Sequence, residues 1–392
     1  MERADRLFTP AFIALTLSEL AYFTAAGLII GVTPFFVAGP IGSDEAGLGL
    51  VAASFAVMTL LLRPYAGRLS DRRGRRPPLI GGAALVAVVM LAHLLTTDLA
   101  VLIGLRLLLG VAEAFYFVAA VAALVDLAPE GRTGEAISLN SLALYLGLAL
   151  GPLIGQLLLD AGGFGAAWVG GLALAVVATA LASRIPETAN VAARPAGADG
   201  GPLIHRAAIG PGLALFTGVA AMSGFLLLAG PHAEAAGLEA WSLAFLLFGA
   251  IVVGLRLAFA RLPDRVPPMR LAAAALALCA IGLATMAAWA GVGGLLAGTA
   301  LLAGGVAFMT PALFAATFAK VAPAERGSAS GTATLFIDLG FGGGPLVVGF
   351  VAAGAGVPAA FVIAGSIALA GAVGTAVASR TGRRIGTSPE AV

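Results

Sequence analysis

Long apolar segments follow one another along almost the whole chain of 392 residues. A transmembrane α-helix needs about 20 mostly apolar residues, and twelve segments meet this requirement, each ending at charged residues, Pro or Gly. Because an α-helix satisfies its backbone hydrogen bonds internally, it can lie in lipid without further partners. The sequence therefore predicts an all-α membrane protein with twelve transmembrane helices. We place them at residues 8–38, 47–66, 78–96, 99–125, 133–159, 164–183, 208–231, 241–262, 269–290, 293–319, 328–355 and 358–379.

The composition agrees with a chain that is embedded in lipid. Hydrophobic residues make up 60% of the chain and charged residues only 11%, against about a quarter charged in an average soluble domain. The 54 glycines are typical of close-packed membrane helices, in which small residues let backbones approach one another. This composition excludes an ordinary water-soluble enzyme, and the net charge of +2 is too small to indicate a nucleic-acid partner. The single cysteine, Cys279, lies in an apolar run, so we expect a buried side chain and no intrachain disulfide.

The charged residues between the predicted helices indicate the orientation in the membrane. Arg and Lys lie in alternate loops, in the central segment and in the C-terminal tail, whereas the remaining loops contain acidic residues and neither Arg nor Lys. Cytoplasmic loops carry an excess of Lys and Arg, so both termini and the central segment are predicted to be cytoplasmic. Trp168, Trp241 and Trp289 fall near the opposite helix ends, where an outer aromatic belt is expected. We therefore predict a multi-pass protein of the plasma membrane.

The two halves of the chain repeat one another at an offset of about 193 residues. The matching residues occur in order, at equivalent points of equivalent helices. The repeat predicts two six-helix bundles, residues 1–184 and 208–392, joined by a cytoplasmic linker at residues 185–207 that is rich in Pro, Gly and Ala. Parallel repeats of this kind place a substrate between the halves near the bilayer midplane, which is a transporter architecture and not an enzyme scaffold. The matching pairs are Arg63 and Arg256, Leu69 and Leu262, Asp71 and Asp264, Pro129 and Pro323, Arg132 and Arg326, Gly151 and Gly344, and Pro152 and Pro345.

Between the second and third predicted helices lies the sequence Gly67-Arg68-Leu69-Ser70-Asp71-Arg72-Arg73-Gly74-Arg75-Arg76, called the signature loop below. It resembles the signature loop of the major facilitator superfamily, G-x-L-A-D-R-x-G-R-R, and departs from it only at Ser70. Twelve spans, the internal repeat and the central linker fit the same family, so the resemblance covers the whole chain. The second half keeps the Leu and Asp of the motif at Leu262 and Asp264 but lacks its glycines.

The resemblance implies that the signature loop helps to close the cytoplasmic side. Asp71 would dock near the start of the eleventh helix, and Asp264 toward the fifth, because a helix N-terminus carries roughly half a positive charge. Alternatively, the Arg residues only fix the topology and bind anionic lipid head groups. The predicted cytoplasmic gate consists of Gly67, Asp71, Arg72, Arg75, Arg76, Arg132, Asp264 and Arg326.

A second motif lies on the fifth predicted helix, where Gly147, Gly151, Pro152 and Gly155 follow one another closely. It resembles the Gly-Pro motif of the superfamily's antiporter branches, above all the drug:proton exporters. Glycines four residues apart flatten one face of a helix, and Pro bends the helix by removing a backbone hydrogen bond. Ordinary packing of small residues is the alternative, and a related sequence, Gly340 to Pro345, lies on the eleventh helix.

Three carboxyl groups lie deep within predicted spans: Glu19, Glu113 and Asp338. A charge at such a depth costs on the order of 3 kcal/mol or more, so it must face protein or water, be paired, or be protonated. Desolvation favours the neutral form of a carboxyl group, which suits a group that binds and releases protons. Arg106, followed by Gly110, resembles a feature of this family's fourth helix that is linked to proton transfer. We predict proton coupling through Glu19, Glu113, Asp338 and Arg106, with a fixed Arg106–Glu113 ion pair as the alternative for Glu113.

The resemblance implies that helices 1, 4, 7 and 10, with contributions from 5, 8 and 11, line the transport cavity. Apolar walls with a few acids suit a neutral or cationic lipophilic substrate and argue against a polyanion. The methionines in these helices are equally compatible with plain core packing. The predicted cavity residues are Glu19, Tyr22, Asn140, Ser141, Tyr145, Met222, Met309 and Asp338.

These features predict a proton-coupled exporter, an antiporter that moves a small hydrophobic or cationic compound out of the cytoplasm by alternating access. Two alternatives are a proton-coupled nutrient symporter and a lipid or lysolipid flippase that needs no proton. The sequence has no phosphate-binding loop of the G-x-x-x-x-G-K-[ST] type and its three histidines are far apart, so neither ATP, a metal nor another cofactor is expected. The expected partners are the substrate, protons and the lipid bilayer, and we expect a monomer.

Overall fold

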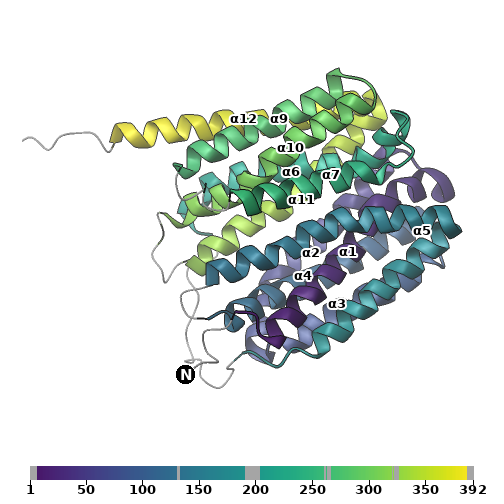
Figure 1. Cartoon of the computed structure of the whole chain (residues 1–392), viewed down its shortest axis with the longest axis horizontal. Coiled ribbons are helices and arrows are strands. Elements are labelled where there is room, and N and C mark those ends of the chain that lie inside the picture. The colour runs from purple at the N-terminus through teal and green to yellow at the C-terminus, as the bar shows by residue number, and fades with distance from the viewer. Residues whose placement is uncertain are drawn as a thin grey trace, which may run out of the picture. The chain divides into compact units, whose positions relative to one another are not determined.

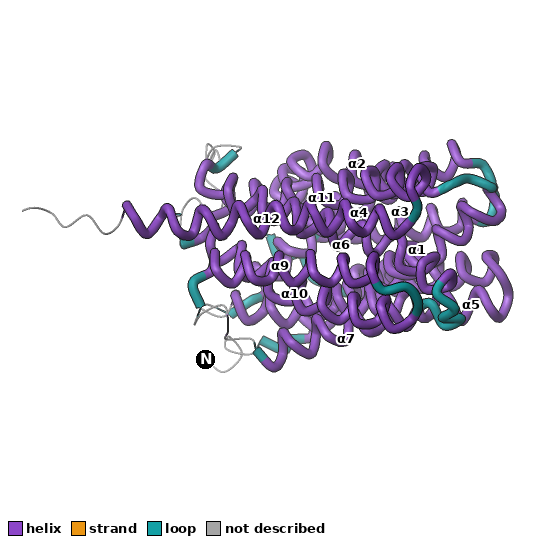
Figure 2. Tube along the Cα trace, turned by 90° about the horizontal axis from the view of Figure 1, so that it is seen from above, coloured by secondary structure: helices purple, strands orange, loops and turns teal. Residues whose placement is uncertain are grey.

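The computed structural model describes residues 7–129, 133–189, 204–259, 262, 266–319, 321 and 326–385. Within these residues every regular element is a helix, and no strand occurs (Figure 2). The elements in chain order are α1 (Pro10–Phe36), the π-helical η1 (Val37–Ile41), α2 (Glu45–Arg73), α3 (Arg76–His93), α4 (Leu99–Leu127), α5 (Thr133–Ser183), α6 (Arg206–Ala235), α7 (Ser242–Ala258), α9 (Pro268–Ala288), α10 (Val292–Phe318), α11 (Arg326–Ala355) and α12 (Val357–Ile385).

Each of the twelve predicted segments corresponds to a helix of the described chain. Ten helices are long and apolar enough to cross a membrane, and α7 is a shorter apolar helix of 17 residues. The element α5 is 51 residues long and contains two residues with non-helical backbone angles, Gly162 and Gly163. It therefore consists of two helices joined at a kink, and these correspond to the fifth and sixth predicted segments. The predicted all-α membrane fold class is confirmed.

Acidic residues of two predicted outer loops begin the helices that follow them. Asp44 Oδ1 accepts a hydrogen bond of 2.9 Å from the backbone N–H of Gly47 at the start of α2. Asp98 Oδ1 accepts one of 2.9 Å from Val101 at the start of α4. The first turn of a helix leaves backbone donors without partners, and an N-cap side chain satisfies one of them. These two acids therefore fix helix starts as well as contributing to the charge pattern.

The helices fall into two compact units. The first contains α1 to α5 together with Ala229–Glu234 and Glu239–Ala250, which include the end of α6 and the start of α7. The second contains α6 up to Leu228, Ala235–Leu238, the rest of α7 from Ile251, and α9 to α12. The limits of the two bundles that we predict from the sequence stay a prediction.

In the first unit, α1 packs along α5, and α4 packs against both α2 and α3 (Figure 1). Glycines permit the closest of these contacts. A Cβ atom at Gly27 of α1 would lie 2.7 Å from the carbonyl oxygen of Gly147 on α5. One at Gly82 of α3 would lie 2.7 Å from the carbonyl oxygen of Ala112 on α4. Such distances are too short for a real side chain, so glycine sets the separation of these helices.

In the second unit, α9 packs against α10 and α12, and α11 packs against α12. Glycine again sets the closest approaches: a Cβ atom at Gly282 of α9 would lie 2.6 Å from the carbonyl oxygen of Gly298 on α10. A Cβ atom at Gly340 of α11 would lie 2.8 Å from the Cβ of Val219 on α6. Cys279 of α9 is 0% exposed, which confirms the prediction that it is a buried residue.

The three tryptophans do not form the outer aromatic belt that the sequence predicts. Trp168 is 1% exposed, Trp241 is 5% exposed and only Trp289, at 56%, has the exposure of a belt residue. Trp168 packs edge to face on Phe36, and the ring of Trp241 lies 4.8 Å from that of Phe35. The prediction is wrong for Trp168 and Trp241 because α1 covers them, a contact that position in the sequence does not reveal.

Candidate functional site

Glu19 lies within α1 and is only 4% exposed. Its carboxylate accepts a hydrogen bond from the side-chain amide of Asn140 on α5. The amide oxygen of Asn140 in turn accepts a hydrogen bond of 3.0 Å from the hydroxyl of Thr16, which precedes Glu19 on the same face of α1. Asn140 therefore bridges two residues of α1 and holds the Glu19 carboxyl group at the contact between α1 and α5.

Two tyrosines stack beside Glu19. The rings of Tyr22 on α1 and Tyr116 on α4 are parallel to within 1°, with centroids 3.9 Å apart. The hydroxyl of Ser18 lies 2.8 Å from that of Tyr116 and donates to the backbone carbonyl of Ala178 at 2.9 Å. Because Ala178 takes the Ser18 proton, Tyr116 is the donor to Ser18. These contacts join α1, α4 and the second half of α5 around one buried position.

Glu113 belongs to the same region. It lies on α4 one turn before Tyr116, is half-buried, and is within hydrogen-bonding reach of the Tyr22 hydroxyl. Glu19 is close enough for the two carboxyl groups to repel each other when both are ionised. The structure thus brings together two of the four predicted proton-coupling residues. We call Glu19, Glu113, Asn140, Tyr22 and Tyr116 the acid cluster.

Arg106 lies outside the acid cluster. It is 7% exposed on α4, and its guanidinium donates a hydrogen bond to the hydroxyl of Thr33 near the end of α1. In the described part of the chain it forms no ion pair with Glu113. The alternative of a fixed Arg106–Glu113 pair is therefore wrong, because the two side chains turn to different partners. The role of Arg106 in proton transfer stays a prediction.

The glycine motif of the fifth predicted helix lies against α1. A Cβ atom at Gly147 would lie 2.6 Å from the carbonyl carbon of Phe23, and one at Gly155 would lie 2.9 Å from the side chain of Val32. The motif therefore keeps two helices at close range immediately beyond the acid cluster. The motif residues at this contact are Gly147, Gly151, Pro152 and Gly155.

Gln156, directly after this motif, connects α5 to the start of α7. Its side-chain amide donates to the backbone carbonyl of Glu239 at 2.8 Å and accepts from the backbone N–H of Ser242 at 2.9 Å. Gln156 is 8% exposed, so both hydrogen bonds are largely shielded from solvent. The sequence analysis missed this residue. The available signal was an amide side chain inside an otherwise apolar run.

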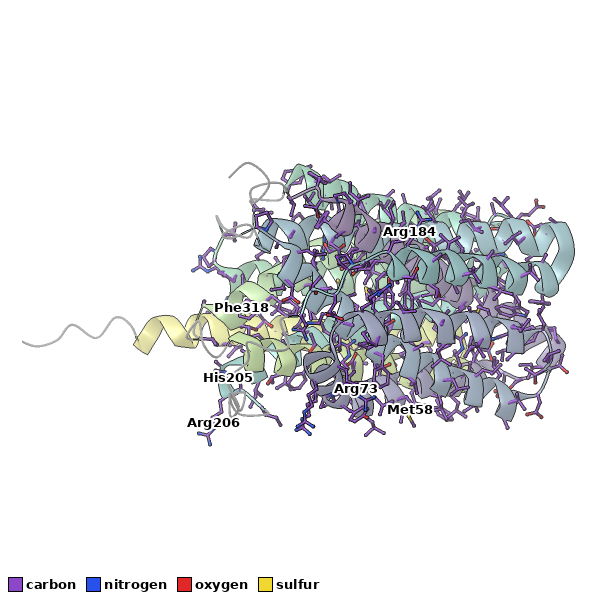
Figure 3. The ribbon with its side chains drawn as sticks, turned by 90° about the horizontal axis from the view of Figure 1, so that it is seen from below. Met58, Arg73, Arg184, His205, Arg206 and Phe318 are labelled. Carbon is purple, nitrogen blue, oxygen red and sulfur yellow. The ribbon has the colours of Figure 1, made fainter. Side chains whose placement is uncertain are left out.

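Residues at the end of α4 and just after α5 hold the signature loop in place. Arg75 Nε lies 3.2 Å from Asp126 Oδ2, which also accepts a hydrogen bond of 3.0 Å from the hydroxyl of Thr188. The two carboxylate oxygens of Glu187 accept from the backbone N–H groups of Arg75 and Arg76 at 2.8 and 3.2 Å. Glu187 therefore caps the start of α3. Figure 3 labels Arg73 in the loop and Arg184 just after α5.

Glu187 is the ionisable group that this network affects most clearly. Partial burial raises its pKa, but hydrogen bonds from the backbone N–H groups of Ala189, Arg75, Arg76 and Thr188 outweigh this effect, so the pKa of Glu187 lies below its ordinary value. The sequence analysis missed both Glu187 and Asp126. The signal that could have found them is topological, because both acids follow predicted spans on the side where the Arg-rich loop is expected.

Two predicted gate residues, Gly67 and Arg72, form no side-chain hydrogen bond or ion pair within the described residues. Gly67 lies in α2, where a Cβ atom would be 3.9 Å from Val118, and Arg72 is exposed. The others fall outside the described residues, and their predicted contacts stay a prediction. They are Arg132 and Asp264 in full and the side chains of Asp71 and Arg326.

The remaining predicted cavity residues are divided between the two units. In the first unit, Ser141 is half-buried and Tyr145 is 8% exposed, both on α5. In the second, Asp338 is 4% exposed on α11, Met222 is 6% exposed on α6 and Met309 is 0% exposed on α10. Met309 packs directly against α6, which favours the core interpretation for this residue.

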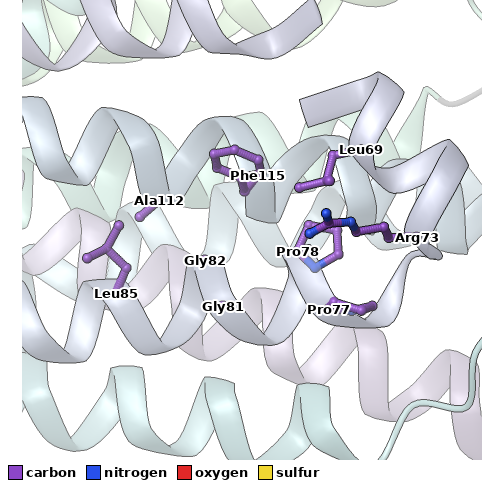
Figure 4. A pocket seen from close by; sticks show the side chains of 9 residues that line it. All are labelled: Leu69, Arg73, Pro77, Pro78, Gly81, Gly82, Leu85, Ala112 and Phe115. Carbon is purple, nitrogen blue, oxygen red and sulfur yellow. The ribbon is translucent and has the colours of Figure 1, made fainter. Parts of the chain in front are cut away.

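A pocket of about 240 Å³ lies between α2, α3 and α4 of the first unit (Figure 4). It is largely apolar, with Arg73 at one end and Leu85 at the other. No member of the acid cluster lines it, so it is not the candidate transport site. Its lining residues are Leu69, Arg73, Pro77, Pro78, Gly81, Gly82, Leu85, Ala112 and Phe115.

Comparison with known proteins finds relatives of nearly the whole chain. Residues 15–296 match the sequence profile described as Major Facilitator Superfamily. The chain is 30% identical over 380 residues to the "Uncharacterized MFS-type transporter YhhS" of Escherichia coli strain K12, which covers 91% of this chain and 90% of that protein. It is 29% identical over 368 residues to the "Uncharacterized MFS-type transporter STM4428" of Salmonella typhimurium, with 90% and 92% covered.

Two solved structures have a similar fold. The human organic anion transporter MFSD10 (TETRAN) superposes with a TM-score of 0.73 at 20% identity, over 93% of this chain and 99% of that chain. A mutant form of the nucleoside transporter NupG superposes with a TM-score of 0.78 at 12% identity, over 94% and 99%. At these identities the similarity establishes the fold and does not extend to the substrate.

Proposed function

The chain belongs to the major facilitator superfamily, and on this premise we propose that it is a proton-coupled transporter that exports a small hydrophobic or cationic compound by alternating access. The observation that carries the proposal is the acid cluster, in which a buried carboxyl group, Glu19, is bonded to Asn140 at a contact between two membrane helices. A polar group in this position is costly, and acids within membrane spans commonly mark ion and substrate pathways.

Glu19 is the main proton carrier in this proposal. Its ionised form costs about 3 kcal/mol or more in the membrane interior, and the hydrogen bond from Asn140 offsets part of that cost. The nearby Glu113 adds repulsion whenever both groups are ionised. The two acids are therefore expected to gain and lose protons as a coupled pair, and not as two independent groups.

Competition between the proton and the substrate provides the coupling. Ionised Glu19 attracts a cationic substrate or one that donates a hydrogen bond, and protonated Glu19 releases it. The stacked rings of Tyr22 and Tyr116 offer an apolar surface beside the acid. A difference in substrate affinity between the two protonation states is what allows a proton gradient to drive transport.

Asp338 is proposed as a second carrier. It lies on α11 in the second unit and is 4% exposed. Because it lies deep within an apolar helix, its ionised form is costly for the same reason as that of Glu19. Each unit thus contributes at least one buried acid to the proposed cycle.

Transport in proteoliposomes with an imposed pH gradient tests the proposal. A thermal-shift screen of lipophilic cations and neutral lipophiles on the purified protein first selects the transported probe, because a bound ligand raises apparent stability. Glu19→Gln should reduce probe-driven proton flux at least about 100-fold while leaving the unfolding temperature close to that of the wild type. Glu234→Gln, which alters an exposed acid near the end of α6, is the matched control and should retain full flux. Wild-type flux in Glu19→Gln would refute the assignment.

The direction of the gradient separates export from the two alternatives. An antiporter accumulates the probe on the side with the higher proton concentration, whereas a symporter moves the probe together with the proton. Probe movement that persists unchanged after a protonophore collapses the gradient would identify a proton-independent carrier of the flippase type.

A further inference from the structure

Arg106 carries a permanent positive charge into the interior of the first unit, where it is 7% exposed. Its guanidinium donates to the hydroxyl of Thr33, whose own proton goes to the carbonyl of Ile29 at 2.6 Å. Arg106 Nε is buried and has no hydrogen-bond partner within the described residues. No acid of the same part of the chain forms an ion pair with it. A buried charge without a counter-charge is strongly unfavourable, so this arrangement is incomplete as it stands.

Near Arg106, two further polar atoms are buried without a hydrogen-bond partner in the described chain. His93, at the end of α3, lies close enough to Arg106 to be affected by its charge, and its ring centroid is 4.8 Å from that of Trp168. His93 Nε2 and Trp168 Nε1 are both buried without a hydrogen-bond partner in the described chain. Native proteins satisfy nearly all buried polar groups. Three such atoms in one region therefore indicate a place that a ligand or water completes.

The chemistry of these atoms indicates what the ligand is. Arg106 and Trp168 present N–H donors, and Arg106 adds a full positive charge. His93 Nδ1 is bonded to the carbonyl of Val89 at 2.8 Å, which places its hydrogen on Nδ1 in the neutral ring. His93 Nε2 is then an acceptor, so among the described atoms of this region the two donors without a partner are Arg106 Nε and Trp168 Nε1, and Arg106 is an uncompensated cation. A group that only accepts hydrogen bonds and carries a negative charge satisfies the Arg106 donor and its charge, whereas the acceptor His93 Nε2 is left to a donor such as the neighbouring Trp168 or water.

We propose that Arg106 binds a single anionic group through the N–H groups that Thr33 does not occupy. One guanidinium balances one charge, so a monoanion fits and a polyanion does not. Thr33 is a positioning residue, since it orients the guanidinium without offering the anion a proton. The site goes beyond the proposed function, which is built on Glu19 and Asp338, and it lies outside the acid cluster.

Two sources of the anionic group share this chemistry. The transported compound can supply it as a carboxylate on a lipophilic body, in which case Arg106 selects the substrate and a lipophilic acid replaces the hydrophobic or cationic compound of the proposed function. Chloride from solution can supply it instead, in which case the anion accompanies any substrate. The experiment distinguishes these sources by using benzoate for the first and chloride for the second.

Thermal unfolding of the purified full-length protein in detergent tests the site without measuring transport. The protein is titrated with sodium chloride or sodium benzoate at constant ionic strength, with sodium gluconate as the replaced salt. The wild type should show a saturable rise in unfolding temperature with at least one of the two anions. Arg106→Gln should abolish that rise. Arg63→Gln is the matched control, because Arg63 is a half-buried arginine of α2 that lies over the Phe117 ring, and it should respond like the wild type.

Two further variants keep the test decisive if Arg106→Gln does not fold. Arg106→Lys retains the charge and should keep the response at an apparent affinity about tenfold weaker, because a single ammonium replaces the planar fork. Thr33→Val should weaken the response without abolishing it.

A response to benzoate alone assigns the site to the substrate, and a response to chloride assigns it to the inorganic ion. The proposal is overturned if gluconate, chloride and benzoate give the same wild-type curve, or if the Arg106 variants respond as fully as the wild type. Because transport is not the readout, failure here leaves the proton-coupling test unaffected.

Discussion

Gly147 and Gly151 of α5 meet α1 in the first unit much as Gly340 and Gly344 of α11 meet α6 in the second. In each case the two glycines bring the backbones of two helices into direct contact, and in each case Pro follows the second glycine. The internal repeat in the sequence is therefore also a repeat of helix packing. Close packing of small residues is what holds membrane helices together, so this part of the pattern serves the fold in both units.

The polar residues at the same positions are not repeated. Gly147 lies against Phe23 and Gly340 against Val219, which aligns Glu19 with Leu215 and, on the partner helices, Asn140 with Ala333. Leu215 and Ala333 are both 0% exposed. The acid–amide pair of the first unit thus corresponds to an apolar pair in the second. The difference teaches that the fold needs the glycines but not the acid, and it supports a functional reason for Glu19.

The largest expected effect concerns the acid of the second unit. Asp338→Asn should reduce proton-driven transport at least about 100-fold, because the neutral amide can no longer exchange a proton. Tyr145→Phe, which alters the position equivalent to Asp338 in the first unit, removes no carboxyl group and should keep transport driven by protons, although it can weaken substrate binding because Tyr145 is a predicted cavity residue. Proteoliposome flux measures both. Full activity in Asp338→Asn would show that only the first unit carries protons, so that the two units would differ more in function than we propose.

The glycine contacts should be equally important in both units. Gly147→Leu and Gly340→Leu each force a side chain into a backbone contact and should each cost about 3 kcal/mol, since overpacking of a tight core is poorly absorbed. Gly104→Leu is the control, because a Cβ atom at Gly104 would have no heavy atom within 4 Å. Thermal unfolding in detergent gives the comparison. A large difference in stability between the Gly147 and Gly340 variants would show that the two glycine contacts are not equivalent.

The polar pair should be dispensable for stability. The double change Glu19→Leu and Asn140→Ala copies the second unit and should leave the free energy of unfolding unchanged or raise it by about 1 kcal/mol, because an apolar pair replaces buried polar groups. Glu19→Leu alone should destabilise by about 1–3 kcal/mol, since it leaves Asn140 with an unsatisfied amide. Both variants should lose proton-driven transport. A double variant less stable than either single variant would show that the pair serves the fold after all.

The smallest expected effect lies at the signature loop of the first unit. Because the folded-state pKa of Glu187 is lowered, its contribution to stability is fully present above the ordinary value of 4.5 and is lost as the pH falls through the lowered value. The unfolding temperature of the wild type should therefore fall slightly more on acidification than that of Glu187→Gln. The exposure of Glu187 keeps this difference small. Equal pH profiles for the two proteins would show that the cap of α3 is not electrostatic.

The sequence predicts the helices well because their signal is local. Apolar length marks each span, and Gly162 and Gly163 separate the two helices of α5 where the sequence also places a break. Burial of Glu19 and Asp338 follows from their depth, which can be counted, together with the cost of placing a carboxyl group against lipid at that depth. Pairings between distant residues cannot be counted in this way.

Arg106 and Gln156 illustrate what a single sequence cannot provide. Arg106 is bonded to Thr33 of another helix, and Gln156 to backbone atoms at the start of α7. Each partner is far away in the chain and has no feature that singles it out. Trp168 shows the same limit for burial, because its exposure depends on which helix covers it. Residue type therefore located the charged groups, and only the fold assigns their partners.

The amide of Asn140 has a fixed polarity, with donors on one end and an acceptor on the other, while Thr16 can play either part. When Glu19 is ionised, the amide directs its nitrogen to the carboxylate and its oxygen to the Thr16 hydroxyl. A half-turn of the amide would let its oxygen accept from a carboxylic acid and its nitrogen donate to Thr16, with both hydrogen bonds preserved. The orientation of the Asn140 amide thus depends on whether Glu19 is protonated. Because both hydrogen bonds are kept in either orientation, the change between them costs little free energy.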